Sequence, residues 1–434
     1  MNVISSSKAR YSGRVQRVLL LSAVFLCCVL PARSQRQLPE GNGKHIVEAV
    51  CAQCHGLDPI TIVDDRTIRA EFAHEDWQNI VNRMVSYSKR DAKYGIKTMT
   101  NDEIPVVIDY LATNFAGDSR PAGVVIPGTA EVSIKEWKVP TVGSHPHDPL
   151  YASDGSIWYT GQMANVMGRF DPKTQQFKEY HLKTPRSGPH GLAADKEGNI
   201  WFTAQGGGYV GKLDPKTGNV TEHKMPSPDL DPHTPIIDQD GTVWFTMQGA
   251  SMVGRIHPKT GEVKVVPTPT PRANPYGMVV SSKNEVFFCE FRTNKLAKID
   301  KNTMQITEYT LPNPETRPRR IAITPDDRIW YGDYSRGYLG VYDPKTGASK
   351  EWPSPSGAKS QPYGIVAIGD IVWYSESGVE KNTLVRFDPK TEKFQTWLIP
   401  SGGGVVRNMS ASPKGEVWMA TSGVNGIAVA EVKQ

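Results

Sequence analysis

Cysteine is scarce in this sequence. Only five of the 434 residues are cysteines, and two of them, Cys27 and Cys28, lie in an N-terminal leader. Cys289 lies in the apolar run EVFFCEF, so we expect a buried free thiol in a strand. The remaining pair, Cys51 and Cys54, is too small for a disulfide framework. The sequence therefore excludes the class of small secreted domains that several disulfides hold together.

Long hydrophobic runs are missing beyond the leader. Residues 1–34 combine basic residues, the apolar run 18–30 and the small residues around Ala32, which together predict a cleaved secretory signal peptide. No later stretch is apolar enough to cross a bilayer, so we expect no membrane span in the mature chain. The expected location is the periplasm or the cell exterior.

A basic tract is missing as well. The leader carries five basic residues and no acidic one, so its removal lowers the formal net charge from +5 to zero. A mature chain that begins at Gln35 has no basic patch to neutralise phosphates. Nucleic acid is therefore not an expected partner.

The segment Cys51-Ala52-Gln53-Cys54-His55 fits the attachment pattern of c-type haem. Two thiols at this spacing can each bond one vinyl group of a porphyrin, and His55 can then ligate the iron as its proximal ligand. A redox dithiol would not require the histidine, and a zinc site would need a second Cys or His pair nearby. The pattern predicts covalently bound haem c.

Residues 41–115 resemble a class I-like monohaem cytochrome c domain, with helical patterns around the attachment segment and over 73–88 and 100–115. The resemblance implies an all-α haem domain over 35–116 that exchanges electrons with a partner cytochrome or oxidoreductase. A methionine sulfur would be the distal iron ligand. Met84 is the favoured candidate, Met99 is the alternative and His74 is a distant third. Met84 could also be a core residue on its helix.

Residues 131–434 carry a repeat. An aromatic residue within a short strand pattern recurs at intervals of 43 residues and finally 45, at Trp158, Trp201, Trp244, Phe287, Trp330, Trp373 and Trp418. Short strands and tight turns at such a period predict an all-β propeller with seven blades, joined to the haem domain by a linker at 117–130. The first strand pattern, VSIKEWKVP, should complete the seventh blade and close the ring.

Two sets of polar residues recur in the propeller repeats. The first set is expected at the start of each innermost strand and comprises His147, His190, His233, Tyr276, Arg319, Tyr363 and Arg407. The second set follows the aromatic strand and comprises Gln162, Gln205, Gln248, Glu290, Asp333, Glu376 and Thr421. We expect the three histidines to converge at the channel mouth as catalytic residues, or as ligands of a divalent metal. The alternative is a polar channel in which they only hydrogen-bond water and strands.

The repeats around Gly188-Pro189-His190-Gly191 and IWFT resemble those of streptogramin B lyase (virginiamycin B lyase) over roughly residues 131–434. The resemblance implies a seven-bladed lyase that opens a cyclic depsipeptide by elimination, with a histidine and two glutamates around Mg²⁺. His190 matches the family histidine, while Gly188 and Gln205 stand at the positions of the two glutamates.

Two functions follow from these patterns. The first is an exported monohaem cytochrome whose propeller holds a substrate, acting as or with a periplasmic oxidoreductase. The alternative is a carbon–oxygen lyase of the virginiamycin B type, or a non-redox propeller that binds an unidentified small molecule. The haem motif favours the first, because a haem serves no evident purpose beside a lyase site.

Overall fold

The computed structural model describes residues 38–53, 74–92, 95–115 and 120–433. The predicted signal peptide, Cys54 and His55 lie outside these residues. No helix in the described part of the chain is both long enough and apolar enough to cross a membrane.

The N-terminal described segments are helical. They form α1 (Lys44–Val50), the 3₁₀ turn η1 (Cys51–Gln53), α3 (His74–Asp91) and α4 (Glu103–Phe115). A reciprocal capping box begins α4, since Thr100 N donates to Glu103 Oε2 at 2.7 Å and Glu103 N donates to Thr100 Oγ1 at 3.3 Å. The helices predicted over 73–88 and 100–115 are therefore confirmed, and α3 extends three residues further than predicted, to Asp91.

An apolar core joins these helices. Trp77, Val81 and Val85 on α3 are buried, as are Val107 and Leu111 on α4. Their spacing of four residues places each set on one face of its helix. The amphipathic pattern of the sequence explains why the two helices pack together.

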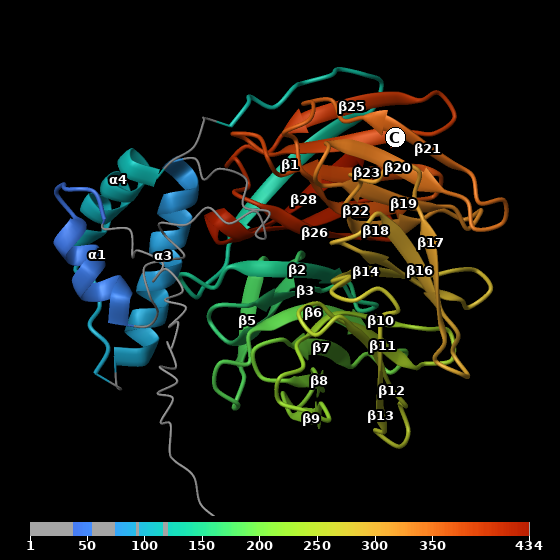
Figure 1. Ribbon diagram of the computed structural model, residues 1–434, viewed down its shortest axis with the longest axis horizontal. Helices are drawn as coiled ribbons and strands as arrows, with labels where there is room; N and C mark the ends of the chain where they lie inside the picture. Colours follow the sequence, from blue (N-terminus) through green and yellow to red (C-terminus); the bar gives the residue numbers. More distant parts are fainter. Residues whose placement is uncertain (1–37, 54–73, 93–94, 116–119, 434) are drawn as a thin grey trace, which may run out of the picture. The chain divides into compact units, whose positions relative to one another are not determined.

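The remaining chain forms seven four-stranded antiparallel sheets, seen as the blades in Figure 1. Blade 1 comprises β2 (Pro146–Tyr151), β3 (Ile157–Gly161), β4 (Val166–Asp171) and β5 (Gln176–His181). Blade 2 comprises β6 (Pro189–Ala194), β7 (Ile200–Ala204), β8 (Tyr209–Leu213) and β9 (Val220–Lys224). Blade 3 comprises β10 (Pro232–Ile237), β11 (Val243–Met247), β12 (Met252–Ile256) and β13 (Val263–Pro267).

Three more blades continue the same order. Blade 4 comprises β14 (Pro275–Val280), β15 (Val286–Glu290), β16 (Lys295–Ile299) and β17 (Ile306–Thr310). Blade 5 comprises β18 (Pro318–Ile323), β19 (Ile329–Asp333), β20 (Tyr338–Tyr342) and β21 (Ser349–Pro353). Blade 6 comprises β22 (Pro362–Ile368), β23 (Ile371–Glu376), β24 (Thr383–Asp388) and β25 (Lys393–Leu398). The predicted number of seven blades is confirmed.

The seventh blade combines the two ends of the propeller. It consists of β26 (Val406–Ala411), β27 (Val417–Thr421) and β28 (Gly426–Lys433), with β1 (Glu131–Lys138) as its outer strand. The short turn η3 (Ser422–Val424) connects β27 to β28. Residues 131 to 138 pair antiparallel with residues 433 to 426, which confirms the predicted ring closure. The pairing gives β28 a partner along an edge that would otherwise be open.

The repeated DPKT turns explain why the two outer strands of a blade form a hairpin. In four blades the turn aspartate accepts the backbone N–H two residues later, at 2.8–2.9 Å: Asp171, Asp214, Asp343 and Asp388. Such a bond stabilises a tight turn. In two of these turns a glycine follows with positive φ, Gly218 at 74° and Gly347 at 75°, which glycine adopts without strain.

The segment 120–130, expected to be part of a linker, lies along blade 6. Ile126 N donates to Thr396 Oγ1 at 2.7 Å, and Thr396 N donates to Ile126 O at 3.0 Å. Glu380 N also donates to Pro121 O at 3.0 Å. Its Pro- and Gly-rich composition suits an extended segment that covers an outer strand.

Candidate functional site

Each inner strand brings its second residue to the propeller axis, and the structure places the three predicted histidines together there. The ring centroids of His147 and His190 lie 3.7 Å apart, as do those of His190 and His233. Tyr276 continues the series, with its ring centroid 4.3 Å from that of His233. All four side chains are buried, with at most 3% of each residue exposed.

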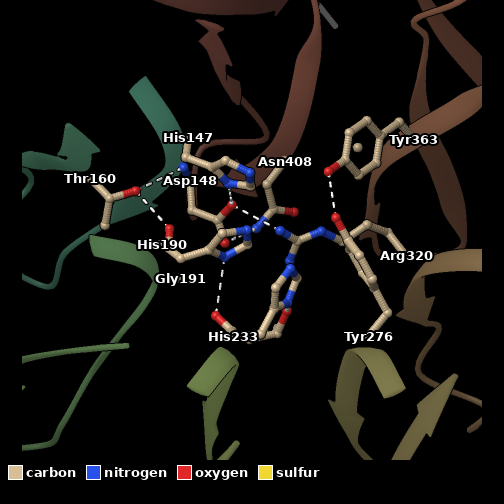
Figure 2. A network of polar contacts seen from close by, with 12 residues as sticks. His147, Asp148, Thr160, His190, Gly191, His233, Tyr276, Arg320, Tyr363 and Asn408 are labelled. Atoms are coloured by element: carbon tan, nitrogen blue, oxygen red, sulfur yellow. Dashed lines mark hydrogen bonds and ion pairs between the residues drawn. The ribbon is translucent and has the colours of Figure 1, made fainter. Parts of the chain in front are cut away.

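Hydroxyl and thiol groups on the second strand of a blade hydrogen-bond to the inner strand of the next blade. Thr160 Oγ1 donates to His190 O at 2.7 Å, and Thr203 Oγ1 donates to His233 O at 2.5 Å (Figure 2 shows the first). Cys289 occupies the same repeat position, and its Sγ donates to Arg319 O at 3.2 Å. The predicted burial of Cys289 is confirmed, and burial raises the pKa of its thiol to about 12. This cysteine is a structural counterpart of the threonines.

The Nδ1 atoms of the histidines are occupied by hydrogen bonds (Figure 2). His147 Nδ1 lies 2.8 Å from Asp148 Oδ1, and His190 Nδ1 lies 3.1 Å from His233 O. Since a carbonyl oxygen only accepts, His190 carries its proton on Nδ1 and keeps a lone pair on Nε2. A carboxylate at the Nδ1 of His147 favours the same tautomer.

Asp148 is the centre of a polar network that spans three blades. Arg320 Nη2 of blade 5 donates to Asp148 Oδ1 at 2.9 Å, and Asn408 Nδ2 of blade 7 donates to Oδ2 at 2.9 Å. Both Asp148 and Arg320 are buried. Figure 2 shows these groups meeting between the inner strands, beside the imidazoles. The network fixes the carboxylate against His147.

Burial controls the protonation of this site. It holds the pKa of all three histidines well below the ordinary value, and the guanidinium of Arg320 acts in the same direction. The imidazoles are therefore neutral at pH 7. Burial also raises the pKa of Asp148, although Arg320 and Asn408 oppose that shift.

Arginine and tyrosine side chains occupy the same repeat position in blades 4 to 7, which form the other side of the channel. The Tyr276 and Tyr363 hydroxyls lie 2.6 Å apart, and the Arg319 guanidinium lies 3.7 Å from the Tyr363 ring centroid. Burial disfavours a phenolate at Tyr363, but Arg319, Arg407 and Arg320 outweigh burial and lower its pKa. This sector is cationic.

A comparison with known families decides the identity of the propeller. The sequence profile of the virginiamycin B lyase family matches residues 122–299 and 197–434, which together include most of the chain. The chain belongs to the virginiamycin B lyase family. The match begins at residue 122, so it does not extend to the helical segments. No curated protein matches the chain in sequence.

Several solved structures share the propeller fold. A streptogramin B lyase is 24% identical, with a TM-score of 0.64, and the match covers 70% of this chain and 98% of that one. A catalytically inactive virginiamycin B lyase from Staphylococcus aureus with quinupristin is 21% identical, with a TM-score of 0.62 and coverage of 69% and 99%. Kuenenia stuttgartiensis hydrazine synthase is 15% identical, with a TM-score of 0.56 and coverage of 66% and 95%.

The residues that match the family's metal site do not fit Mg²⁺. Gly188 and Gln205 stand where the resemblance implies glutamates, and Gln205 Oε1 accepts from Gln162 Nε2 at 3.5 Å. Mg²⁺ is usually bound through anionic oxygen ligands. A neutral amide and a glycine supply no anionic oxygen.

The carboxylates of the second predicted set do not compensate for this loss. Glu376 accepts from Ser354 Oγ at 2.8 Å and from Thr383 Oγ1 at 2.5 Å, and Asp333 pairs with Arg336 at 2.6 Å. Both carboxylates are held by donors outside the inner strands, from the loop residues Ser354 and Arg336 and from Thr383 at the start of β24. Burial raises the pKa of Glu290 to about 8.

A divalent ion elsewhere in the channel stays a prediction. Within the described residues, His147, Asp148 and His190 are a group whose ligand atoms lie within 4.8 Å of one another. His233 is not part of that group, so the expected set of three histidines is not the one that the geometry favours. The Arg320 guanidinium on Asp148 occupies an oxygen that a metal would need.

The sequence did not single out Asp148, Arg320 or Asn408. Each follows a member of the first set directly along its inner strand, but the same position holds glycine in blades 2, 4 and 6. A repeat search therefore finds no common residue type. The available signal was polarity at that position in otherwise apolar inner strands.

Proposed function

We propose that the propeller binds a small carbonyl compound at the histidines and catalyses elimination across a carbon–oxygen bond without a metal ion. The observation that carries this proposal is the buried pair of His147 and Asp148 beside His190. This proposal takes up the lyase alternative that the sequence suggests, but arginine side chains replace the positive charge of the metal ion.

The histidines supply the base. With Nδ1 occupied, the lone pair on Nε2 of His147 or His190 is the available proton acceptor. Their depressed pKa values keep both imidazoles unprotonated at neutral and mildly acidic pH. Asp148 orients His147 and stabilises its cationic form after proton transfer.

The arginines supply the positive charge that stabilises the transition state. Removing a proton next to a carbonyl group places negative charge on the carbonyl oxygen, which fixed cationic donors stabilise. Arg320 is anchored by Asp148, Arg319 precedes it on the same inner strand, and Arg407 lies on the inner strand of blade 7. These guanidinium groups take the part that a metal plays in a Lewis-acid mechanism.

The reaction balances without an added reagent. A histidine Nε2 takes the proton from the carbon next to the carbonyl group, and the electron pair of that C–H bond forms a carbon–carbon double bond. The C–O bond at the adjacent carbon breaks, and its electron pair leaves with oxygen. The histidinium then returns the proton to the leaving oxygen.

Deuterium exchange in D₂O tests this function. The probes are malate and quinupristin, the ligand of the solved relative, and the readout is deuterium or a double bond at the carbon next to the carbonyl group. Wild-type protein should exchange or eliminate with at least one probe. The His147→Gln/His190→Gln variant should lose the activity, while the exposed control His257→Gln should keep it. Equal activity in the double variant would refute the proposal.

We also propose that the helical segments bind haem c. This is the first function that the sequence predicts, an electron-transferring monohaem cytochrome. Cys51 directly continues α1 into η1, and Lys97 N donates to Gln53 Oε1 at 3.0 Å, so the chain before α4 is joined to the attachment turn. Cys51, Cys54 and His55 would hold the group, which supplies one-electron transfer when bound.

The methionines differ in their surroundings. Met99 is buried, with 3% exposed, whereas Met84 is only partly buried beside the apolar face of α3. Met99 is thus already enclosed by protein side chains, which favours a packing role. Met84 remains the proposed distal ligand.

A further inference from the structure

Two channel arginines lack the partners that buried arginines normally have. Among the described residues, Arg319 and Arg407 form no ion pair, and the Nε of each is buried without a hydrogen-bond acceptor. Both side chains are partly exposed, so solvent or a ligand can reach them. Arg320 differs, because its charge is compensated by Asp148.

Aromatic rings hold Arg319 in place. Its guanidinium lies 3.7 Å from the ring centroid of Tyr363, 4.3 Å from that of Tyr334 and 5.0 Å from that of Phe291. Stacking on ring faces fixes the plane of the guanidinium, whose edge carries N–H donors that an acceptor can meet. The arginine is therefore oriented before any ligand binds.

Tyr363 lies on the blade between those of the two arginines. Its hydroxyl meets the Tyr276 hydroxyl at 2.6 Å, and 1% of the residue is exposed. Blades 5, 6 and 7 thus present a guanidinium, a phenol and a second guanidinium at the same position of successive inner strands. This set consists of hydrogen-bond donors and two uncompensated positive charges.

We propose that Arg319 and Arg407, with Tyr363 on the intervening blade, bind the carboxylate of a small organic acid. This inference rests on the proposed function and names its substrate class: a carboxylic acid with an oxygen leaving group on the carbon β to the carboxylate. The substrate would lie between this sector and the histidines of blades 1 to 3.

The chemistry favours a carboxylate for two reasons. A planar group with two oxygens matches the fork of a guanidinium, and the resulting charge-assisted hydrogen bonds are strong. A carboxylate also makes the neighbouring C–H bond a poor acid unless cations neutralise its charge. Arg319 and Arg407 can neutralise the charge of the carboxylate, and the neutral histidines at the same repeat position of blades 1 to 3 can accept the proton.

Calorimetric titration with malate tests the assignment. Malate carries a hydroxyl group β to one carboxylate, and its diamide keeps the carbon skeleton without the charge. Wild-type protein should bind malate and bind the diamide and sulfate more weakly. Arg407→Gln and Arg319→Gln should each weaken malate binding about tenfold or more. The matched control is Arg328→Gln, which removes an arginine of an exposed ion pair on blade 5.

The outcomes separate this inference from the proposed function. Equal binding of malate and its diamide, equal binding of sulfate, or unchanged binding in both folded arginine variants would overturn the carboxylate site. A variant that fails to fold is replaced by Arg407→Lys, which keeps the charge and should bind malate more weakly than wild type because it lacks the fork. Arginine-dependent malate binding without proton exchange would support this site and refute the elimination reaction.

Discussion

Asp148 of blade 1 and Arg320 of blade 5 form a buried ion pair between strands that are far apart in the chain. The Oδ1–Nη2 distance is 2.9 Å, the residues are 172 positions apart, and both are almost fully enclosed. A buried ion pair is costly to break, because removing one partner leaves an uncompensated charge. Here the same carboxylate also contacts His147, so the pair joins propeller stability to the orientation of the proposed base.

Asp148→Asn should therefore destabilise the protein strongly. The variant leaves the Arg320 guanidinium buried without a counter-charge, and the expected loss is about 3–5 kcal/mol of unfolding free energy. Urea denaturation gives the measurement. The matched control, Asp326→Asn, removes the acid of an exposed pair and should cost less than about 1 kcal/mol. A loss at Asp148 no larger than that of the control would contradict the role of the network.

Stability should depend on pH through the buried histidines. Their folded pKa lies below the unfolded value, so the unfolded chain binds more protons under acid conditions. The stabilisation from keeping them neutral is present above about pH 6.5 and is lost as pH falls below it. Each histidine should contribute up to about 1.4 kcal/mol per pH unit in that range.

Melting temperatures between neutral and mildly acidic pH test this dependence. The variant in which His147, His190 and His233 are all glutamine should show a flatter profile below the histidine range, whatever its stability at neutral pH. His257→Gln on an exposed turn should keep the wild-type slope. Parallel profiles of the triple variant and the wild type would show that these histidines do not titrate as proposed.

Haem attachment should depend on the two cysteines of the motif. Protein made together with a cytochrome c maturation system should carry one covalent haem that survives a denaturing gel. Cys51→Ala/Cys54→Ala should abolish the peroxidase stain, while Cys289→Ala, which removes the buried propeller thiol, should retain it. Haem staining in the double variant would rule out covalent attachment at this motif.

The distal ligand can be identified in the same protein. Met84→Ala should remove the weak red absorption band that marks an iron–thioether bond, and Met99→Ala should leave that band in place. Loss of the band only in Met99→Ala would assign the distal position to Met99 instead.

Ring closure through β1 should stabilise the whole propeller. Deleting residues 132–140 removes almost the entire outer strand of blade 7 and leaves β28 with an open edge. We expect aggregation and a large fall in melting temperature, measured by light scattering and calorimetry. A deletion variant that stays monomeric and melts like the wild type would show that the ring does not depend on this strand.

The sequence predicts the fold well because the propeller is periodic. Trp158 and Trp201 occupy equivalent buried positions in successive blades, and the 43-residue interval fixes both blade number and the place of β1. The histidines were found in the same way, since His147, His190 and His233 share one repeat position. Residues that recur at one repeat position can therefore be identified from the sequence alone.

The missed features are those that do not repeat. The contacts of Asp148 with Arg320 and Asn408 connect blade 1 to blades 5 and 7, and no local pattern encodes which blades meet through the channel. Glu376 lies at the expected repeat position, but the direction of its carboxylate depends on hydrogen bonds from Ser354 in a loop and from Thr383 at the start of β24. Composition also predicted a linker at 117–130, whereas hydrogen bonds hold its described part, residues 120–130, against blade 6.

Base catalysis by His147 and His190 without a metal ion can be tested by combining chelation with mutation. The measurement is the rate of deuterium exchange or elimination with malate and quinupristin, for wild type and His147→Gln/His190→Gln, before and after EDTA treatment. EDTA should leave the wild-type rate unchanged, and the double variant should be inactive in both conditions. Loss of activity with EDTA and its recovery with added Mg²⁺, or full activity in the double variant, would contradict it.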